Sequence, residues 1–271
     1  MDILPIIVVG LLPAIVLFVY IYWRDKYQHE PIRWLLGGVG MGILSTILAI
    51  IWETIGGIII DPLSELIGPF FGGITQAFFG AAIPEECCKL FCLWLLLRRN
   101  KYFDEHVDGI VYAACVGLGF AAIENLMYLF DNLDDWQSVG LVRAIFSVPG
   151  HFFFAVIMGY FYSLAHFSKQ TSFKFLFAIC ALVVPVIVHG IYDSCLFVLE
   201  CENIIITVLS ILVFLALCVG MNIAAFMHIR HLLKKDEAAQ AEAQAAAQAA
   251  TQAATQAQAE AQAAPITNDA E

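Results

Sequence analysis

Seven long apolar stretches restrict what this chain can fold into more than any other feature does. A transmembrane helix needs about 20 consecutive apolar residues, and hydrophobic residues make up 61% of the 271-residue sequence. No soluble domain of this length needs so much apolar sequence. We therefore predict an all-α, polytopic integral membrane helical bundle with about seven transmembrane helices. The predicted spans are residues 3–23, 34–57, 75–97, 107–130, 143–167, 174–199 and 204–229.

The charges in the connections predict the orientation of the bundle. Lys and Arg gather in the first, third and fifth connections and after the last span, whereas Asp and Glu gather in the second, fourth and sixth. Cytoplasmic loops carry an excess of Lys and Arg, so we expect the N-terminus outside and the C-terminus inside. Asp2 precedes the first span while Arg24 and Lys26 follow it, which favours an uncleaved anchor over a cleaved signal peptide. The one cation in the connections predicted outside is Arg143.

The sequence changes character at Asp236. From there to residue 271 it is rich in Ala and Gln and has no apolar stripe to bury. We expect a membrane-embedded domain over residues 1–235 and a low-complexity cytoplasmic tail over residues 236–271 that is partly helical or disordered. The formal charge of −11 comes from acids in the outer connections and the tail. No basic stripe predicts nucleic acid as a partner.

Ionisable residues inside the spans converge on one depth. A charge at the bilayer centre costs about 2.5–3.5 kcal/mol on insertion scales. At 1.5 Å per residue from the outer helix ends, Glu85 and His189 lie about 15 Å deep and His151 about 12 Å. Glu124 and Asp193 lie about 9 Å deep by the same measure. Four predicted helices therefore place polar side chains at similar depth in the outer half of the membrane.

The spacing of these residues predicts pairs within single helices. Glu85 and Lys89 are four residues apart, so they can pair on one helix face. Glu86 points about 100° away from Glu85. His189 and Asp193 are also four apart, and such a carboxylate fixes the tautomer of its imidazole partner. A purely structural network is the alternative interpretation, but Asn, Thr or Gln would join helices at lower cost.

Proline lies beside the polar residues in three of these helices. Pro84 precedes Glu85, Pro149 precedes His151 by two residues, and Pro185 lies four residues before His189. Proline kinks a helix, and broken backbone at membrane depth is tolerated where it lines a cavity. A cavity that holds a carboxylate base, water and histidine donors would form a hydrolase site. Because its substrate must enter the membrane, a membrane-anchored protein is the expected partner, together with the lipid bilayer.

Short motifs on these helices resemble one family. The sequence PEECCK at residues 84–89 resembles the EExxK motif of PrsW-type intramembrane proteases. The later motifs of that family match in order, and an early loop signature is similar to HEP at residues 29–31. The later matches are GFAAIEN at residues 119–125, GHFFFA at 150–155 and HGIYD at 189–193. The resemblance covers roughly residues 24–200. The resemblance implies a protease-like domain within residues 1–235. PrsW proteins belong to a superfamily with the type II CAAX prenyl proteases.

The resemblance implies roles for the converging residues. Glu85 would be the catalytic base that activates water, with Glu86 beside it. His151 and His189 would bind the water or the oxyanion, and Asp193 would orient His189. Supporting or substrate-binding roles would fall to Lys89, Glu124 and Asn125. Glu53, in the second predicted span, has no assigned role.

The cofactor is open between none and a divalent metal. The family has been described both as metallopeptidase and as glutamic-type protease, and the chain has no HExxH helix of the zincin kind. We favour metal-free chemistry. If a metal is present, Glu86, His151 and His189 would be its ligands.

The sequence leaves two other functions open. Acid–His chains also relay protons, so a proton-coupled transporter is one alternative, although paired internal repeats typical of transporters are not evident. A CAAX-type prenyl protease is the other, but its cytosolic substrates would require a site that opens inward. The expected function is an intramembrane endopeptidase in the cell (plasma) membrane, with its active site in the outer half.

Overall fold

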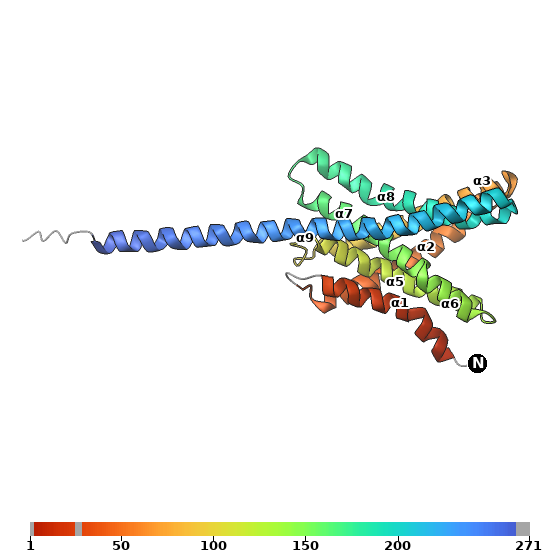
Figure 1. Cartoon of the computed structure of the whole chain (residues 1–271), viewed down its shortest axis with the longest axis horizontal. Coiled ribbons are helices and arrows are strands. Elements are labelled where there is room, and N and C mark those ends of the chain that lie inside the picture. The colour runs from red at the N-terminus through yellow and green to blue at the C-terminus, as the bar shows by residue number, and fades with distance from the viewer. Residues whose placement is uncertain (1–2, 25–28, 264–271) are drawn as a thin grey trace, which may run out of the picture.

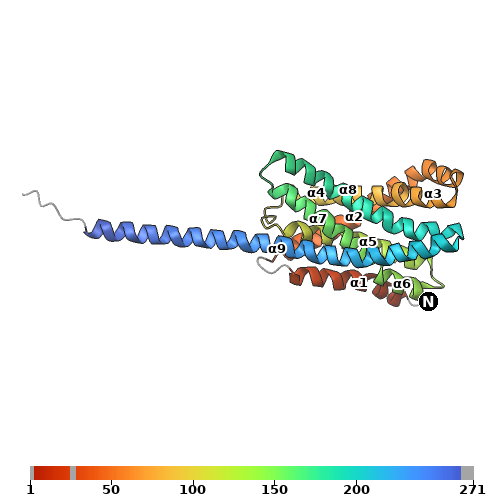
Figure 2. The same ribbon diagram turned by 45° about the horizontal axis from the view of Figure 1, so that its top comes forward.

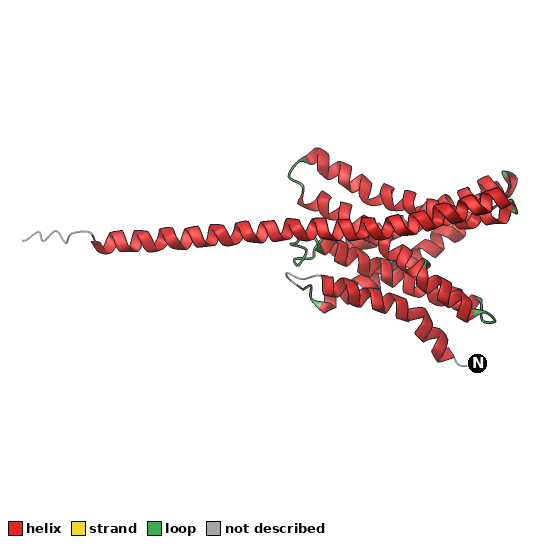
Figure 3. Cartoon of the chain, in the orientation of Figure 1, coloured by secondary structure: helices red, strands yellow, loops and turns green. Residues whose placement is uncertain are grey.

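The computed structural model describes residues 3–24 and 29–263. Asp2 and Lys26, which entered the predicted orientation, lie outside the described residues, as does the end of the tail at residues 264–271. Across the described ranges the regular structure is helical and contains no strand (Figure 3). The predicted all-α class is therefore confirmed.

Helices follow one another with short connections. Their bounds are α1 (Ile3–Arg24), α2 (Ile32–Leu66), α3 (Gly68–Thr75), η1 (Gln76–Ala82), α4 (Ile83–Leu97), α5 (Asp108–Asp131), α6 (Trp136–Ile145), α7 (Ser147–Phe167), α8 (Thr171–Phe197), η2 (Val198–Cys201) and α9 (Ile204–Ala263). Here η1 is a π-helical segment and η2 a short 3₁₀ turn.

Within the described ranges, six helical segments are long and apolar enough to cross a membrane. They cover every predicted span except residues 75–97, which form the last residue of α3, then η1 and α4. That stretch is helical throughout, but a π-helical segment interrupts it and Glu85, Glu86 and Lys89 reduce its hydropathy. The chain is thus a polytopic membrane bundle. The predicted span over residues 75–97, which carries Glu85, Glu86 and Lys89, is the one that differs from a regular apolar span.

The centre of the bundle is α5, which is buried along most of its length. In Figures 1 and 2, α1 and α8 lie on opposite flanks, with α5 and α7 between them. A Cβ at Gly42 of α2 would lie 2.8 Å from the Cα of Gly119 on α5, and one at Gly159 of α7 would lie 2.7 Å from the Cα of Ile110. Small residues therefore let α2 and α7 approach the α5 backbone closely, as is common between membrane helices.

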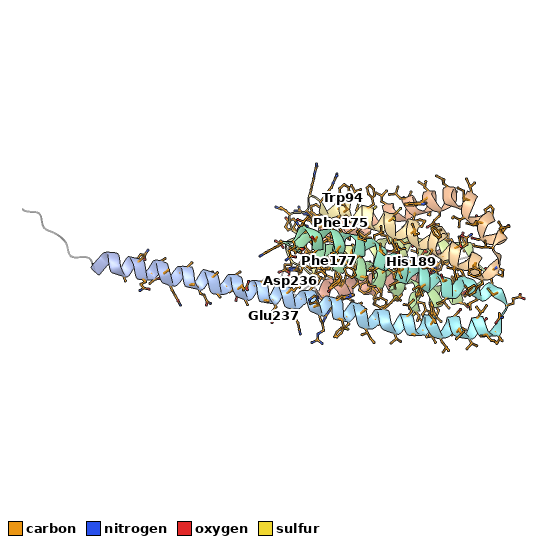
Figure 4. The ribbon with its side chains drawn as sticks, turned by 90° about the horizontal axis from the view of Figure 1, so that it is seen from above. Trp94, Phe175, Phe177, His189, Asp236 and Glu237 are labelled. Atoms are coloured by element: carbon orange, nitrogen blue, oxygen red, sulfur yellow. The ribbon has the colours of Figure 1, made fainter. Side chains whose placement is uncertain are left out.

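The last helix continues past the bundle without a break. α9 contains both the last predicted span and the described part of the Ala/Gln-rich tail, and it projects well clear of the other helices (Figure 1). Asp236 lies where the helix leaves the bundle (Figure 4). Its buried carboxylate accepts hydrogen bonds from His106 N and His106 Nδ1 at 2.7 Å and from Val107 N at 2.9 Å. The predicted boundary at residue 236 thus coincides with an anchor that ties α9 to the start of α5.

Replacing Asp236 with Ala should destabilise this anchor. The change leaves the His106 and Val107 N–H groups without their acceptor, and an unsatisfied buried donor costs about 1–3 kcal/mol. We expect a lower melting temperature in detergent and faster amide hydrogen exchange at residues 104–108. Glu237→Ala is the matched control, because Glu237 is exposed and adjacent. Equal melting temperatures and exchange rates for both variants would contradict the anchoring role.

Candidate active site

Polar residues from separate helices meet inside the bundle. Glu85 and Glu86 lie in the first turn of α4, directly after the π-helical segment η1. Pro84 has no N–H group to donate to the preceding helical turn, and it lies where the π-helical segment passes into α4. His151 lies on α7, and His189 lies on α8 inside the bundle (Figure 4). The π-to-α transition thus lies directly before the paired carboxylates, and π segments are frequent at functional sites.

The ammonium group of Lys89 is the hub of this cluster. Lys89 is 1% exposed, and its Nζ lies 2.9 Å from Glu85 Oε2 and 2.8 Å from Glu86 Oε1. The same Nζ lies 3.1 Å from His151 Nδ1 and 3.9 Å from the centre of the Phe120 ring. An ammonium has three N–H donors, so all of them are used. The predicted Glu85–Lys89 pair is present, and Lys89 also reaches Glu86 because positions i+3 and i+4 share a helix face.

The hydrogen bonds around His151 define its tautomer. An ammonium can only donate, so His151 Nδ1 accepts the bond from Lys89. The proton of a neutral His151 is then on Nε2, which lies 2.8 Å from Glu124 Oε2. Glu124, predicted only as a supporting residue, thus forms a hydrogen bond with His151, a predicted catalytic residue.

Arg143 is a site residue that sequence reasoning missed. Its Nη2 donates to Glu124 Oε2 at 2.6 Å, its Nε donates to Asn125 Oδ1 at 2.9 Å, and its guanidinium stacks over Tyr128. Asn125 Nδ2 in turn donates to Gly10 O on α1 at 2.8 Å. A signal was available in the sequence, because Arg143 is the one cation among connections that are otherwise acidic.

His189 lies between two carboxylates. Its Nδ1 is 2.9 Å from Glu86 Oε1, and its Nε2 is 3.1 Å from Asp193 Oδ2, so the contact predicted from the i,i+4 spacing is present. The ring stacks on Phe154, with ring centres 4.5 Å apart. Both ring nitrogens can donate to a carboxylate when both carry protons. The two ion-pair networks, one through Lys89 and one through His189, share Glu86.

A cavity of about 840 Å³ opens onto these groups. We call it the larger cavity. Its polar wall is formed by Glu85, Glu124, Arg143, His151, His189 and Asp193. Aromatic side chains form much of the rest, namely Tyr128, Phe146, Phe154, Tyr192, Phe197 and Phe214. The exposed residues Asn132, Asp135 and Ser138 line its mouth, at the end of the bundle where α1 begins (Figure 1).

The donor set at the cavity fits a divalent metal ion. Glu85, His151 and His189 each offer a ligand atom, and these atoms lie within 4.8 Å of one another. Carboxylate oxygen and imidazole nitrogen are the ligands of many catalytic zinc sites. Glu85 takes the place that the prediction gave to Glu86, whose Oε2 has no hydrogen-bond partner among the described residues. Lys89 donates to the same Glu85 and His151 that would bind the ion.

Comparison with known proteins gives one consistent family. A model of the "PrsW family intramembrane metalloprotease" family matches residues 30–221. Protease PrsW of Bacillus subtilis (strain 168) is 35% identical over 216 residues, 78% of this chain and 90% of the relative. Protease PrsW of Oceanobacillus iheyensis is 34% identical over 212 residues, 78% and 92% of the two chains. Protease PrsW of Geobacillus kaustophilus is 33% identical over 187 residues, 68% and 76%.

No solved structure matches the chain. The family match nevertheless spans well over half of the sequence and includes every residue of the polar cluster. The relatives agree with it over most of their own length. The resemblance noted from the short motifs is therefore confirmed, and the chain belongs to the PrsW family of intramembrane proteases.

Proposed function

We propose that this protease cuts a membrane-anchored protein and uses Glu85 as the general base that activates water. The observation that carries the proposal is the convergence of Glu85, His151 and His189 on the wall of the larger cavity. A cavity of about 840 Å³ has room for a stretch of extended peptide beside these groups. Its aromatic lining suits the apolar side chains of a transmembrane segment.

Lys89 holds Glu85 in place for this task. One oxygen of Glu85 accepts a hydrogen bond from the Lys89 ammonium, and the carboxylate lines the cavity. The water oxygen attacks the peptide carbonyl carbon while its proton passes to Glu85, and the carbonyl oxygen takes up negative charge. When the C–N bond breaks, Glu85 gives the proton to the leaving amine. One water is consumed, and a new carboxyl group and a new amine are released.

The two histidines have different roles, since His189 stabilises the charge that develops and His151 holds Lys89 in place. When both nitrogens of His189 carry protons, the Nδ1–H group can exchange Glu86 for the substrate oxyanion while Nε2–H stays on Asp193. Asp193 orients that ring through Nε2. His151 accepts from Lys89 and donates to Glu124, so it keeps the ammonium beside Glu85.

The same site would accommodate the metal that the family description implies. Glu85, His151 and His189 would hold a divalent ion, which when bound acts as a Lewis acid toward a carbonyl and toward water. An ion on His151 would need the Nδ1 lone pair that otherwise accepts from Lys89, so that hydrogen bond would be lost. Glu124 would still orient His151 through Nε2, and Asp193 would still orient His189.

The cavity opens, on this proposal, on the non-cytoplasmic side of the plasma membrane. The support comes from the connection between α5 and α6, which contributes Asn132 and Asp135 to the mouth of the cavity. That connection has acids and no Lys or Arg, the composition typical of outer loops. The basic connection between α4 and α5 lies at the opposite end of the bundle, where α9 emerges (Figure 2).

Replacing Glu85 with Gln should abolish proteolysis, because the amide keeps the size of the side chain but cannot take the proton. We expect at least about a 100-fold lower rate, in line with the loss of a general base. The measurement is cleavage of a panel of single-span membrane reporters in proteoliposomes, with products identified by mass spectrometry. Glu65→Gln is the control, since Glu65 is exposed and does not line the larger cavity.

The same assay with excess chelator separates the two chemistries. Wild-type activity that survives the chelator supports a metal-free mechanism, and activity that is lost and then restored by zinc supports a metal-dependent one. Wild-type cleavage by Glu85→Gln would show that the base has been assigned to the wrong residue.

Arg143→Lys should lower kcat with little change in KM. Lysine has one ammonium where arginine has a planar fork, so it cannot bond Glu124 and Asn125 in the same geometry. Glu124 then loses the support that presents it to His151, and we expect about a tenfold lower kcat, a loss of about 1.4 kcal/mol. Arg230→Lys on the exposed part of α9 is the control. A change in KM alone would indicate substrate binding instead of positioning.

A further inference from the structure

A second, smaller cavity lies on the other side of the catalytic carboxylates. Its volume is about 280 Å³, and it is bounded by α2 and α5, whereas the larger cavity is bounded mainly by α6, α7, α8 and α9. Four residues line both cavities, namely Ala81, Glu85, Glu124 and Tyr128. Glu85 is thus part of the wall between the two cavities.

The smaller cavity lies further along α2 than the point where α2 and α5 touch. The two helices are in close contact at Gly42 and Gly119, where neither has a side chain to keep them apart. One turn further on, Thr46 Oγ1 is 3.5 Å from Phe120 O. Two turns beyond Thr46, Glu53 of α2 also lines the gap between these helices. The gap extends along α5 to Asp131, which is exposed at the end of that helix.

Glu53 is a carboxyl group without a protein partner. Over residues 3–24 and 29–263, no side chain or backbone group forms a hydrogen bond or ion pair with it. An unpartnered carboxyl group at membrane depth is costly unless water solvates it. A water occupies about 30 Å³ in the liquid, so a cavity of about 280 Å³ has room for several. The volume of the cavity and the unpartnered carboxyl group both favour water beside Glu85.

We propose that the smaller cavity supplies the water for peptide hydrolysis and that Glu53 positions this water for Glu85. A substrate segment in the larger cavity would cover Glu85 from that side, and lipid surrounds the bundle. Each cut consumes one water, so a second route from the exposed Asp131 lets water reach Glu85 while substrate is bound. This inference rests on the proposed role of Glu85 and assigns Glu53 as a positioning residue.

The first test detects the water itself. Short X-ray pulses generate hydroxyl radicals from water, and mass spectrometry then locates the oxidised side chains in the folded protein. Phe120 lines the smaller cavity but not the larger one, and it is 2% exposed. Its oxidation therefore reports water inside the smaller cavity. Phe152 is the internal reference, since it is equally buried and lines neither cavity. We expect oxidation of Phe120 at several times the rate of Phe152, and equal rates would overturn the proposal.

The second test changes Glu53. Glu53→Leu should lower the oxidation of Phe120 severalfold and lower kcat about tenfold at unchanged KM, because the cavity loses its hydrogen-bonding group. Glu53→Gln should keep most of both, since an amide still binds water. Thr54→Val is the matched control, because the Thr54 hydroxyl bonds only Ile50 O in its own helix. If Glu53→Leu does not fold, the wild-type labelling and Glu53→Gln still decide the question.

The outcomes separate this inference from the proposed function. If Glu85→Gln is inactive and Glu53→Leu is fully active, the role proposed for Glu53 is overturned and the role proposed for Glu85 stands. If Glu85→Gln is active, the proposed mechanism is overturned. The oxidation of Phe120 would still report whether the smaller cavity is hydrated. A lower kcat for Glu53→Gln equal to that for Glu53→Leu would show that Glu53 acts by its charge and not by holding water.

Discussion

The buried ammonium of Lys89 is the interaction on which the site depends. It lies within hydrogen-bonding distance of Glu85, Glu86 and His151, and without it two adjacent carboxylates would share a low-dielectric interior. Two like charges so close together are strongly unfavourable unless a cation compensates them. The Lys89 charge therefore permits both carboxylates in one helical turn. It also links α4 to α7, so the chemistry and the packing rely on the same group.

Much of the fold could be predicted from the sequence because membrane helices are fixed by length and hydropathy. Residues 75–97 differ from the apolar span predicted there, and they carry the three charges of Glu85, Glu86 and Lys89. An apolar pattern does not predict the π-helical segment that they contain. Within the site, the i,i+4 contacts of Glu85 with Lys89 and of His189 with Asp193 could be predicted, since helix geometry alone determines them. Contacts between helices could not, because they depend on how the helices pack.

Arg143 and Glu53 illustrate that limit in opposite ways. Arg143 looked like a loop residue, yet the fold of α6 against α5 brings it to Glu124 and Asn125. Glu53 was recognised as an unusual residue in a span, but its neighbours come from α4 and α5, far away in the sequence. In both cases the residue type was informative, whereas the partner became apparent only in three dimensions. The small residues Gly42 and Gly119 determine where α2 and α5 touch and hence where the gap beside Glu53 begins.

The unbroken course of α9 has an electrostatic consequence for the described part of the tail. From Asp236, where the helix is anchored, to Ala263 it rises about 40 Å at 1.5 Å per residue. Electrostatic influence in physiological salt decays over about 8 Å. A charge near Ala263 therefore lies several decay lengths from Asp236, beyond the electrostatic reach of the charges at that end of the bundle.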